Sequence, residues 1–295
     1  MNKVMSSNKN SNEKLVSWLF ETNAVRVCPK NKPFWYTSGT IGPYYINTHF
    51  LYGSEEKANS LLKTIDEVKD DKIGCPQKIL ELVTENYNNT AVYKALIDEL
   101  CAFLLEKFDM NEVDCISGGE RRDWFFSLIT AKMLSKPHLT IYKDQSAVIS
   151  DGDGTRLTGN LNGMKVLHIA DLITEASSYE RAWIPAVRNL NGEMKWSVSI
   201  VDRNQGGAQL LERNGVEPYS MIYVDYNLFD TALIMGLIDL DQHDMLLRYI
   251  DNPRESMRQF LIEHPEFLED SLAADERTSQ RARLCIEKDV YQLKG

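Results

Sequence analysis

The segment Met164–Ser178, MKVLHIADLITEASS, constrains the fold of this chain more than any other stretch. It opens with a short apolar run that includes Val166 and Ile169, which is typical of a buried parallel strand. The run leads to Asp171, and small polar residues take the chain to the end of the segment. Free amides at a helix start bind anions, and the helix dipole adds to this. The segment therefore predicts an α/β protein with a phosphate site at the end of this strand.

The residues after this polar turn predict a helix. Ser177 is followed three residues later by Glu180, which fits a capping box. Apolar residues recur at helical spacing over Tyr179–Leu190. Pro185 lies inside this range and should bend or shorten the helix.

Apolar strands alternate with helices through the middle of the chain. The strands are predicted at 113–117, 138–142, 164–170 and 195–202. This alternation is typical of a parallel sheet that binds its ligands at the carboxyl ends of its strands. Four polar segments should then share that edge: Gly118–Asp123, Lys143–Asn162, Asp171–Ser178 and Asp202–Gly207.

The segments outside this alternation divide the chain further. We expect a disordered lead-in over 1–12, a main domain over 13–215 with a helical insertion at about 55–108, and a C-terminal helical extension over 216–295. A loop is predicted at Lys69–Lys78, and an edge strand at Met221–Val224. Helices are predicted at Glu13–Thr22, Thr90–Phe108, Trp124–Leu134, Leu228–Met235, Asp241–Ile250, Asn252–Glu263 and Ser271–Lys288.

Composition excludes several classes of partner. The formal net charge of −10 argues against a nucleic acid or an anionic membrane surface as partner. No apolar run approaches the roughly 20 residues of a membrane span, and the polar N-terminus lacks a signal-peptide core. The five cysteines are odd in number and form no Cys-x-x-Cys pair, which favours reduced thiols without a zinc site. We therefore expect a cytoplasmic protein that binds small molecules.

The central segment resembles the phosphoribosyl-pyrophosphate (PRPP) loop of the type I phosphoribosyltransferases. In that family a hydrophobic strand runs into two acidic residues, an aliphatic pair and a turn rich in Thr, Gly and Ser. Asp171 matches the second acid, and Thr174 begins the turn. Ala170 stands in place of the first acid, and Glu175-Ala176 replaces the usual Thr-Gly. The PRPP loop of this chain is therefore degenerate.

Two further segments resemble the orotate phosphoribosyltransferase branch of that family. Phe34–Tyr45, FWYTSGTIGPYY, keeps the frame Phe-x-x-x-Ser-Gly-x-x-x-Pro-x-Tyr, but Thr37 replaces a Lys, and Asn47 and His49 replace an Asp and an Arg. By local rules this arm is a β-hairpin whose aromatic residues either pack in a core or line a site. The strand end at Asp202–Gly207, Asp-Arg followed by Gly-Gly, is a nearly complete match.

The loops of the family that act on pyrophosphate are altered here. The pyrophosphate loop corresponds to Ser117–Asp123, where Arg121 and Arg122 either clamp an anion or pair with surface acids. The catalytic loop corresponds to Asp144–Asn162, but the family's Lys and His are absent from it. Lys143, at the preceding strand end, lines up with a basic residue of the family and is within reach of pyrophosphate.

One motif in the same region favours a different chemistry. Asp151-Gly-Asp153-Gly-Thr155 is similar to the aspartate-nucleophile motif of haloacid-dehalogenase-type phosphatases, in which the first Asp attacks phosphorus. A plain Asp/Gly turn explains the same residues. No later Asp-Asp pair stands at a strand end to complete the magnesium site of such an enzyme.

The resemblance implies a type I phosphoribosyltransferase core with an N-terminal hood, and transfer of phosphoribosyl from PRPP to a planar, orotate-like base. It implies Mg²⁺ as cofactor, a homodimer, and catalytic roles for Asp171 and Lys143, with Asp171 also a weak Mg²⁺ ligand. Phe34 and Arg203 would bind the base, although a structural salt bridge is the alternative for Arg203. The residues implied to bind PRPP are Arg121, Arg122, Lys143, Asp171, Thr174, Glu175, Ala176, Ser177 and Ser178. A non-catalytic PRPP- or nucleotide-binding protein on the same fold is the main alternative.

Overall fold

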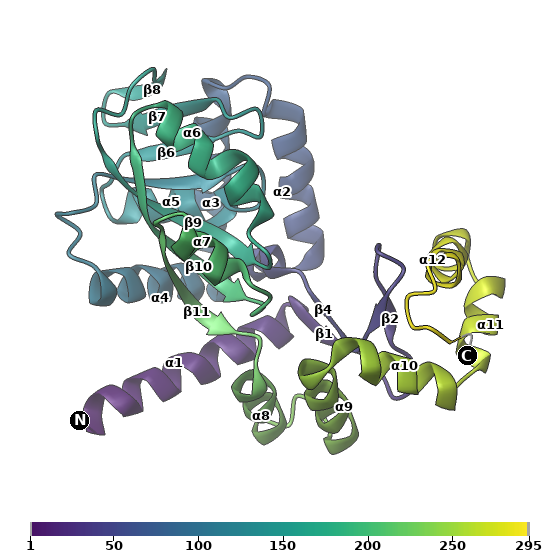
Figure 1. Cartoon of the computed structure of the whole chain (residues 1–295). Coiled ribbons are helices and arrows are strands. Elements are labelled where there is room, and N and C mark those ends of the chain that lie inside the picture. The colour runs from purple at the N-terminus through teal and green to yellow at the C-terminus, as the bar shows by residue number, and fades with distance from the viewer. Residues whose placement is uncertain (1, 294–295) are drawn as a thin grey trace. The chain divides into compact units, whose positions relative to one another are not determined.

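The computed structural model describes residues 2–293, which form two compact units (Figure 1). The first unit consists of the chain up to Asn23 together with Thr48–Val224. The second consists of Ala24–Asn47 together with the chain from Asp225 onward. These bounds differ from the predicted domains, because the N-terminal arm belongs with the C-terminal helices. The first unit also runs beyond residue 215, because a further strand joins its sheet there.

The first unit is built on one seven-stranded sheet of order β11-β10-β9-β5-β6-β7-β8. The first five strands in this order run parallel, and β7 and β8 are antiparallel to their neighbours. The expected parallel α/β sheet is therefore confirmed. The strands are β5 (Cys115–Gly119), β6 (His138–Ile141), β7 (Ala147–Asp151), β8 (Gly154–Leu157), β9 (Lys165–Ile173), β10 (Glu193–Asp202) and β11 (Glu217–Tyr223).

Helices cover both faces of this sheet. The short helices α6 (Ile184–Asn189) and α7 (Gly207–Arg213) lie on one face, and α5 (Trp124–Met133) lies on the other (Figure 1). Residues 124–131 of α5 are all buried, because the helices α3 and α4 pack against the side of α5 that faces away from the sheet. A helix buried all round must be apolar on every side, and the sequence WFFSLITA satisfies this.

The predicted insertion at 55–108 is helical throughout most of its length. It consists of α2 (Glu55–Val68), α3 (Gly74–Asn89) and α4 (Ala91–Lys107). The side chain of Ser54 caps α2 by accepting a hydrogen bond from the amide of Lys57. The predicted loop at 69–78 is shorter than expected, since α3 already begins at Gly74. Pro76 lies in the first turn of α3, where its missing N–H costs no intrahelical hydrogen bond.

The N-terminal helix is longer than the sequence predicts. Helix α1 spans Asn2–Glu21, so residues 2–12 are helical where a disordered lead-in was expected. Residue 1 lies outside the described residues. Leu15, Val16 and Leu19 are buried and anchor the C-terminal half of α1. Once this half is fixed, each further residue adds a helical hydrogen bond without a new nucleation cost.

The second unit joins the N-terminal arm to five helices. Strand β1 (Val25–Val27) pairs with β4 (Tyr44–Ile46), and β2 (Phe34–Trp35) forms the expected hairpin with β3 (Ile41–Gly42). The helices are α8 (Tyr226–Ile234), α9 (Leu240–Asp251), α10 (Pro253–Glu263), α11 (Glu266–Ala273) and α12 (Glu276–Glu287). The prediction of one helix at 271–288 is wrong. Helix α11 ends at Ala273, and the side chain of Asp275 caps a separate helix, α12.

Aromatic residues of the arm pack within this second unit. The Trp35 ring stacks on Phe267 with 5.7 Å between centroids, and its Nε1 donates a hydrogen bond to Ser271 Oγ. The ring of Tyr44 contacts Phe229 and Tyr249. For Trp35 and Tyr44, the core-packing interpretation of the arm is therefore confirmed.

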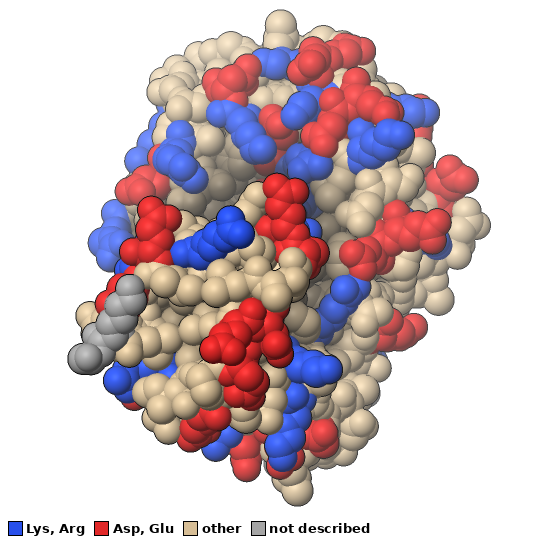
Figure 2. All heavy atoms as spheres, turned by 90° about the vertical axis from the view of Figure 1, so that its right-hand side faces the viewer, with Lys and Arg blue, Asp and Glu red and all other residues tan. Residues whose placement is uncertain are grey.

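On the face drawn in Figure 2, no single patch of acidic side chains dominates the surface. Basic and acidic side chains alternate over that face. No helix among residues 2–293 is both long enough and apolar enough to cross a membrane. The five cysteines are free thiols, and four of them are buried.

A buried histidine makes the stability of the first unit depend on pH. His138 is 3% exposed, and its two ring nitrogens bond Thr140 Oγ1 and Ser127 Oγ, each at 2.9 Å. Burial, together with the nearby His168, lowers the pKa of His138 to about 3. In the unfolded chain this side chain takes up a proton near pH 6.5.

We expect His138 to destabilise the fold progressively as the pH falls below about 6.5, since only the unfolded state then binds the proton. The slope should approach about 1.4 kcal/mol per pH unit between pH 6 and 4. Urea unfolding of the wild type and of His138→Gln over this range measures it. The free energy of unfolding of the variant should depend less steeply on pH, by about 1.4 kcal/mol per pH unit. Equal slopes for the two proteins would contradict the prediction.

Candidate functional site

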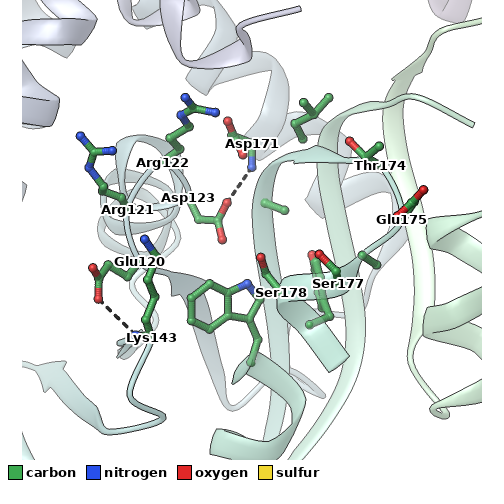
Figure 3. Close-up of a pocket in the computed structure, with 15 residues that line it drawn as sticks. Glu120, Arg121, Arg122, Asp123, Lys143, Asp171, Thr174, Glu175, Ser177 and Ser178 are labelled. Carbon is green, nitrogen blue, oxygen red and sulfur yellow. Dashed lines mark hydrogen bonds between the residues drawn. The ribbon is translucent and has the colours of Figure 1, made fainter. Parts of the chain in front are cut away.

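A cavity of about 320 Å³ opens at the carboxyl ends of β5, β6 and β9 in the first unit (Figure 3). All nine residues that the sequence assigns to PRPP line it: Arg121, Arg122, Lys143, Asp171, Thr174, Glu175, Ala176, Ser177 and Ser178. They come from three segments, the β5–α5 turn, the end of β6, and β9 with the turn after it. The parallel strands bring these segments together because their carboxyl ends share one edge.

The turn after β9 exposes a row of backbone amides. The carbonyl of Thr174 accepts a hydrogen bond from Gly207 N at 3.0 Å, which ties the turn to the start of α7. The carbonyl of Ala176 accepts from the amides of Tyr179 and Glu180. The amides of residues 175–178, in contrast, donate to no acceptor among residues 12–293. These four donors are therefore available to an anion in the cavity.

The helix after this turn begins differently from the prediction. The capping box of Ser177 and Glu180 is absent, because Ser177 Oγ instead accepts a hydrogen bond from Arg181 Nη2 at 3.1 Å. The helix continues through a π-helical turn, η2 (Tyr179–Trp183), into α6. Pro185 stands in the first turn of α6. The regular helix is only six residues long, in agreement with the shortening predicted from this proline.

Glu175 and Ala176 are the two departures from the family turn. The side chain of Glu175 is exposed and points away from Arg122 and Lys143 (Figure 3). Ala176 has a φ of 54°, in the left-handed region that glycine adopts at little cost. The turn thus keeps a glycine-like backbone without glycine, and the carboxylate of Glu175 does not fill the cavity.

Neutralising Glu175 should strengthen anion binding modestly. We expect Glu175→Gln to bind inorganic phosphate about 2- to 5-fold more tightly, because the carboxylate repels the anion through solvent, where charge interactions are weak. Titration calorimetry at 20 mM and 500 mM NaCl measures the gain, which should shrink at high salt. Weaker phosphate binding by the variant would show that Glu175 supports the turn instead.

The two arginines of the β5–α5 turn have different surroundings. Arg121 Nη2 lies 2.5 Å from Asp66 Oδ2 on α2, so this guanidinium is held by an ion pair. Arg122 is exposed, and its guanidinium has no ion pair or hydrogen bond to any of residues 12–293. Lys143 has no ion pair within the same range, and its ammonium group extends into the cavity (Figure 3). The anion-clamp interpretation therefore fits Arg122, and the ion-pair interpretation fits Arg121.

Asp171 lies at the floor of the cavity and is 8% exposed. Burial raises the pKa of its carboxyl well above the usual range, and the negative charge of Asp123 adds to this, while Arg122 opposes it. The charged form of this carboxyl is therefore disfavoured by the protein alone. A bound cation, or hydrogen-bond donors of a ligand, would stabilise that charged form.

Six residues that line the cavity were not assigned to it from the sequence: Glu120, Asp123, Ala170, Leu172, Tyr179 and Trp183. Glu120 Oε2 accepts a hydrogen bond from the amide of Lys143 at 3.1 Å, which links two of the three segments. Asp123 Oδ1 accepts one from the amide of Asp171 at 3.0 Å. Asp123 immediately precedes a helix in a turn with two arginines, and this position was the available signal.

The two residues predicted to bind a base do not line the cavity. The amide of Arg203 donates to the carbonyl of Ile173 at 2.9 Å, so Arg203 and Asp171 do lie on the same edge of the sheet. Its side chain is half-buried. Phe34 belongs to the second unit, where its ring packs against Tyr45 with 4.9 Å between centroids.

The segment predicted as a catalytic loop is mostly a hairpin. Strand β7 runs antiparallel to β6 and turns into β8 at residues 151–154, so this turn lies at the opposite edge of the sheet from Asp171. The prediction that all of Lys143–Asn162 lies at the ligand edge is therefore wrong: the turn at 142–146 lies at that edge, and the turn at 151–154 lies at the opposite one. Asp151 forms a bidentate ion pair with Arg156 and accepts the amide of Asp153, as in an ordinary Asp turn.

The cavity suits a magnesium ion that arrives with a phosphorylated ligand. Residues 12–293 contain no group of three or more His, Cys, Asp or Glu side chains placed to hold a metal alone. Magnesium, however, is commonly held by one or two carboxylates together with substrate phosphates and water. Asp171, with Asp123 beside it, provides that minimal set.

Comparison with known proteins identifies the fold and a partial sequence similarity. The chain is 32% identical over 74 residues to the orotate phosphoribosyltransferase of Methanopyrus kandleri, covering 25% of this chain and 40% of that protein. It is 29% identical over 87 residues to the orotate phosphoribosyltransferase of Picrophilus torridus, covering 30% and 51%. The match thus spans about half or less of these relatives. No protein-family model matches the chain.

Solved structures agree on the fold. The UMP synthase of Leishmania donovani superposes with a TM-score of 0.53 and 17% identity, over 81% of this chain and 41% of that one. The orotate phosphoribosyltransferase of Francisella tularensis superposes with a TM-score of 0.51 and 12% identity, over 79% and 96%. At these identities the similarity establishes the architecture, an α/β fold with a mostly parallel sheet.

Proposed function

We propose, because this chain has the fold of the type I phosphoribosyltransferases and resembles orotate phosphoribosyltransferases in sequence, that it transfers phosphoribosyl from PRPP to a ring nitrogen of a planar base and releases pyrophosphate. One observation carries the proposal. A single cavity at the carboxyl edge of the sheet combines free backbone amides, free cations and a buried carboxylate. These three groups match the phosphate, diphosphate and hydroxyls of PRPP.

Each group has a proposed partner on the substrate. The amides of residues 175–178 bind the 5′-phosphate, since they have no acceptor among residues 12–293. Arg122 and Lys143 bind the diphosphate, and Arg121 adds charge at the rim from its pair with Asp66. Asp171 accepts hydrogen bonds from ribose hydroxyls.

The chain contributes mainly by positioning and by charge. Loss of pyrophosphate leaves an oxocarbenium-like sugar, so the protein must hold both reactants in place and exclude water. Lys143 and Arg122 stabilise charge that develops on the departing pyrophosphate. Asp171 would hold a magnesium ion that arrives with PRPP, and such an ion would supply positive charge against the diphosphate.

The proposed acceptor is a carboxylated base of the orotate type. Arg203 follows the strand that carries Asp202, and its planar guanidinium suits bidentate recognition of a carboxylate. Phe34 is the proposed stacking surface for a planar ring. We further propose a cytoplasmic homodimer in pyrimidine nucleotide metabolism, by similarity to the orotate enzymes alone. Analytical ultracentrifugation tests the dimer directly.

A non-catalytic PRPP-binding protein is the second candidate. The residues that correspond to the catalytic loop lack its Lys and His, and many of them form the β7–β8 hairpin away from the cavity. A loop group that acts only in the transition state affects turnover and leaves binding in place. This candidate therefore predicts PRPP affinity without pyrophosphate release.

Two measurements separate these functions. Titration calorimetry with PRPP and Mg²⁺ measures binding, and a pyrophosphate-release assay with orotate, uracil and purine bases measures transfer. Release with a base supports the enzyme, and binding without release supports the second candidate. Absence of PRPP binding would contradict both. Asp151→Asn, in the distant hairpin, serves as the control and should behave as wild type; a phosphatase activity that this change removes would instead support the phosphatase motif.

A further inference from the structure

Asp123 reaches the floor of the cavity from a turn that is 48 residues from Asp171 in sequence. Its Oδ1 accepts the amide of Asp171, and its Oδ2 accepts the amide of Gly119, both at 3.0 Å. It is 7% exposed and lines the cavity. Each carboxylate oxygen has two lone pairs, so one acceptor site remains on Oδ1 for a ligand, while the second site on Oδ2 lies toward His168.

A buried histidine stands behind Asp123. His168 is fully buried on β9, and its Nδ1 lies 2.8 Å from Ser117 Oγ. Its Nε2 lies 3.4 Å from Asp123 Oδ2 and has no hydrogen bond to any of residues 12–293. The ring is fixed further by Tyr179, at 4.8 Å between centroids, and by Trp183, at 6.5 Å.

These contacts define the tautomer of His168 when Asp123 is ionised. The hydroxyl of Ser117 donates to Nδ1, and the proton on Nε2 then faces the carboxylate. The opposite tautomer would place a nitrogen lone pair against a negative oxygen. His168 is thus arranged to orient Asp123 from the side that the ligand does not reach.

The cavity floor therefore has two carboxylates where β9 alone supplies one. Ala170, which precedes Asp171, presents only a methyl group to the cavity. Two adjacent carboxylates repel each other unless a ligand supplies donors or a cation. A vicinal diol supplies two hydroxyl donors a short distance apart, and a charged acceptor makes each such hydrogen bond strong.

We propose that Asp123 and Asp171 together bind the vicinal hydroxyls of a pentose 5-phosphate, and that His168 is the positioning residue that orients Asp123. The inference rests on the proposed function only in placing a sugar phosphate in this cavity, and it does not require transfer to occur. Asp123 gives the site its preference for ribose over 2-deoxyribose.

A comparison of three ligands in wild type and Asp123→Asn tests the pair. Calorimetry measures ribose 5-phosphate, 2-deoxyribose 5-phosphate and inorganic phosphate. Wild type should prefer the ribose ligand by about 10-fold or more, as expected for one charge-assisted hydrogen bond. Asp123→Asn should lose most of this preference and keep its phosphate affinity within about 2-fold, since the amides of residues 175–178 are unchanged. A preserved preference, or an equal loss for all three ligands, would overturn the proposal.

The role of His168 has its own test, which also applies if Asp123→Asn does not fold. The amide nitrogen of glutamine corresponds to Nε2 of histidine, and that of asparagine to Nδ1. His168→Gln should therefore retain the ribose preference, and His168→Asn should lose about 5-fold or more of it. His138→Gln, a buried histidine outside the cavity, is the matched control and should keep it. Equal behaviour of the two His168 variants would exclude a positioning role.

The outcomes separate this inference from the proposed function. Ribose preference that depends on Asp123, without pyrophosphate release for any base, supports the inference and contradicts the enzyme. Pyrophosphate release, together with a ribose preference that Asp123→Asn leaves intact, supports the enzyme and contradicts the inference. Absence of ribose 5-phosphate binding by wild type would contradict the inference by itself.

Discussion

Replacing Asp171 with asparagine is expected to lower kcat/KM for pyrophosphate release by about 100-fold. In the proposed role of Asp171, the change removes a charged acceptor for ribose hydroxyls, which corresponds to about 2.7 kcal/mol of lost transition-state stabilisation. PRPP affinity should fall with it, because the same hydrogen bonds act in the bound substrate. Steady-state kinetics and calorimetry with PRPP measure the two effects.

Stability distinguishes this loss from unfolding. Burial and Asp123 raise the pKa of Asp171, so its charged form weakens the native state at neutral pH. Asp171→Asn should therefore keep or raise the Tm at pH 8. Asp114→Asn is a control at the other edge of the sheet, where Asp114 Oδ2 accepts the amide of Lys165. A variant at Asp171 that retains wild-type kcat/KM would exclude this residue from the site.

Gly207→Ala is expected to disrupt the turn that carries the free amides. An added Cβ would lie 2.3 Å from Ile173 Cγ2 and 2.7 Å from the carbonyl oxygen of Thr174. Backbone must move to accept it, so we expect a loss of about 1–3 kcal/mol in the free energy of unfolding. Phosphate affinity should also fall, about 10-fold, because the amides of residues 175–178 lose their common geometry.

Gly159→Ala is the matched control for this prediction. Gly159 has no atom within 4 Å of an added Cβ, so the variant should unfold and bind phosphate as wild type does. Urea unfolding and phosphate calorimetry on both variants make the comparison. Unchanged phosphate affinity in a destabilised Gly207→Ala would show that the turn does not depend on its contact with α7.

The sequence was sufficient to predict the parts of the fold that depend on local pattern. Apolar runs ending in polar turns located β5, β6, β9 and β10, and parallel pairing then placed their loops on one edge. The nine residues assigned to PRPP lie in three separate segments and line one cavity. That agreement follows from topology, since carboxyl ends of parallel strands must meet.

The features that the sequence did not predict depend on distant contacts. Asp123 acquires its place from the amide of Asp171 and from His168, neither of which is near in sequence. The polar run after Lys143 has alternation but no signal of direction, so the hairpin of β7 and β8 was missed. Arg121 and Arg122 are identical in type, and only the position of Asp66 on α2 distinguishes them.

The arm shows the same dependence on distant contacts. Trp35 donates a hydrogen bond to Ser271, 236 residues further along the chain, and stacks on Phe267. No periodicity in either segment indicates that pairing. The arm was therefore assigned to the main domain by its sequence frame, whereas its packing groups it with the C-terminal helices.

The second unit combines residues 24–47 with the chain from Asp225 onward, so the stability of the arm depends on the C-terminal helices. A chain shortened after Val224 would keep every strand of the main sheet and lose the aromatic partners of Trp35 and Tyr44. The two-residue strands β2 and β3 are too short to persist without them. Truncation of the C-terminal helices should therefore destabilise the arm near residue 35 first. A protease should cut there before it cuts within the sheet.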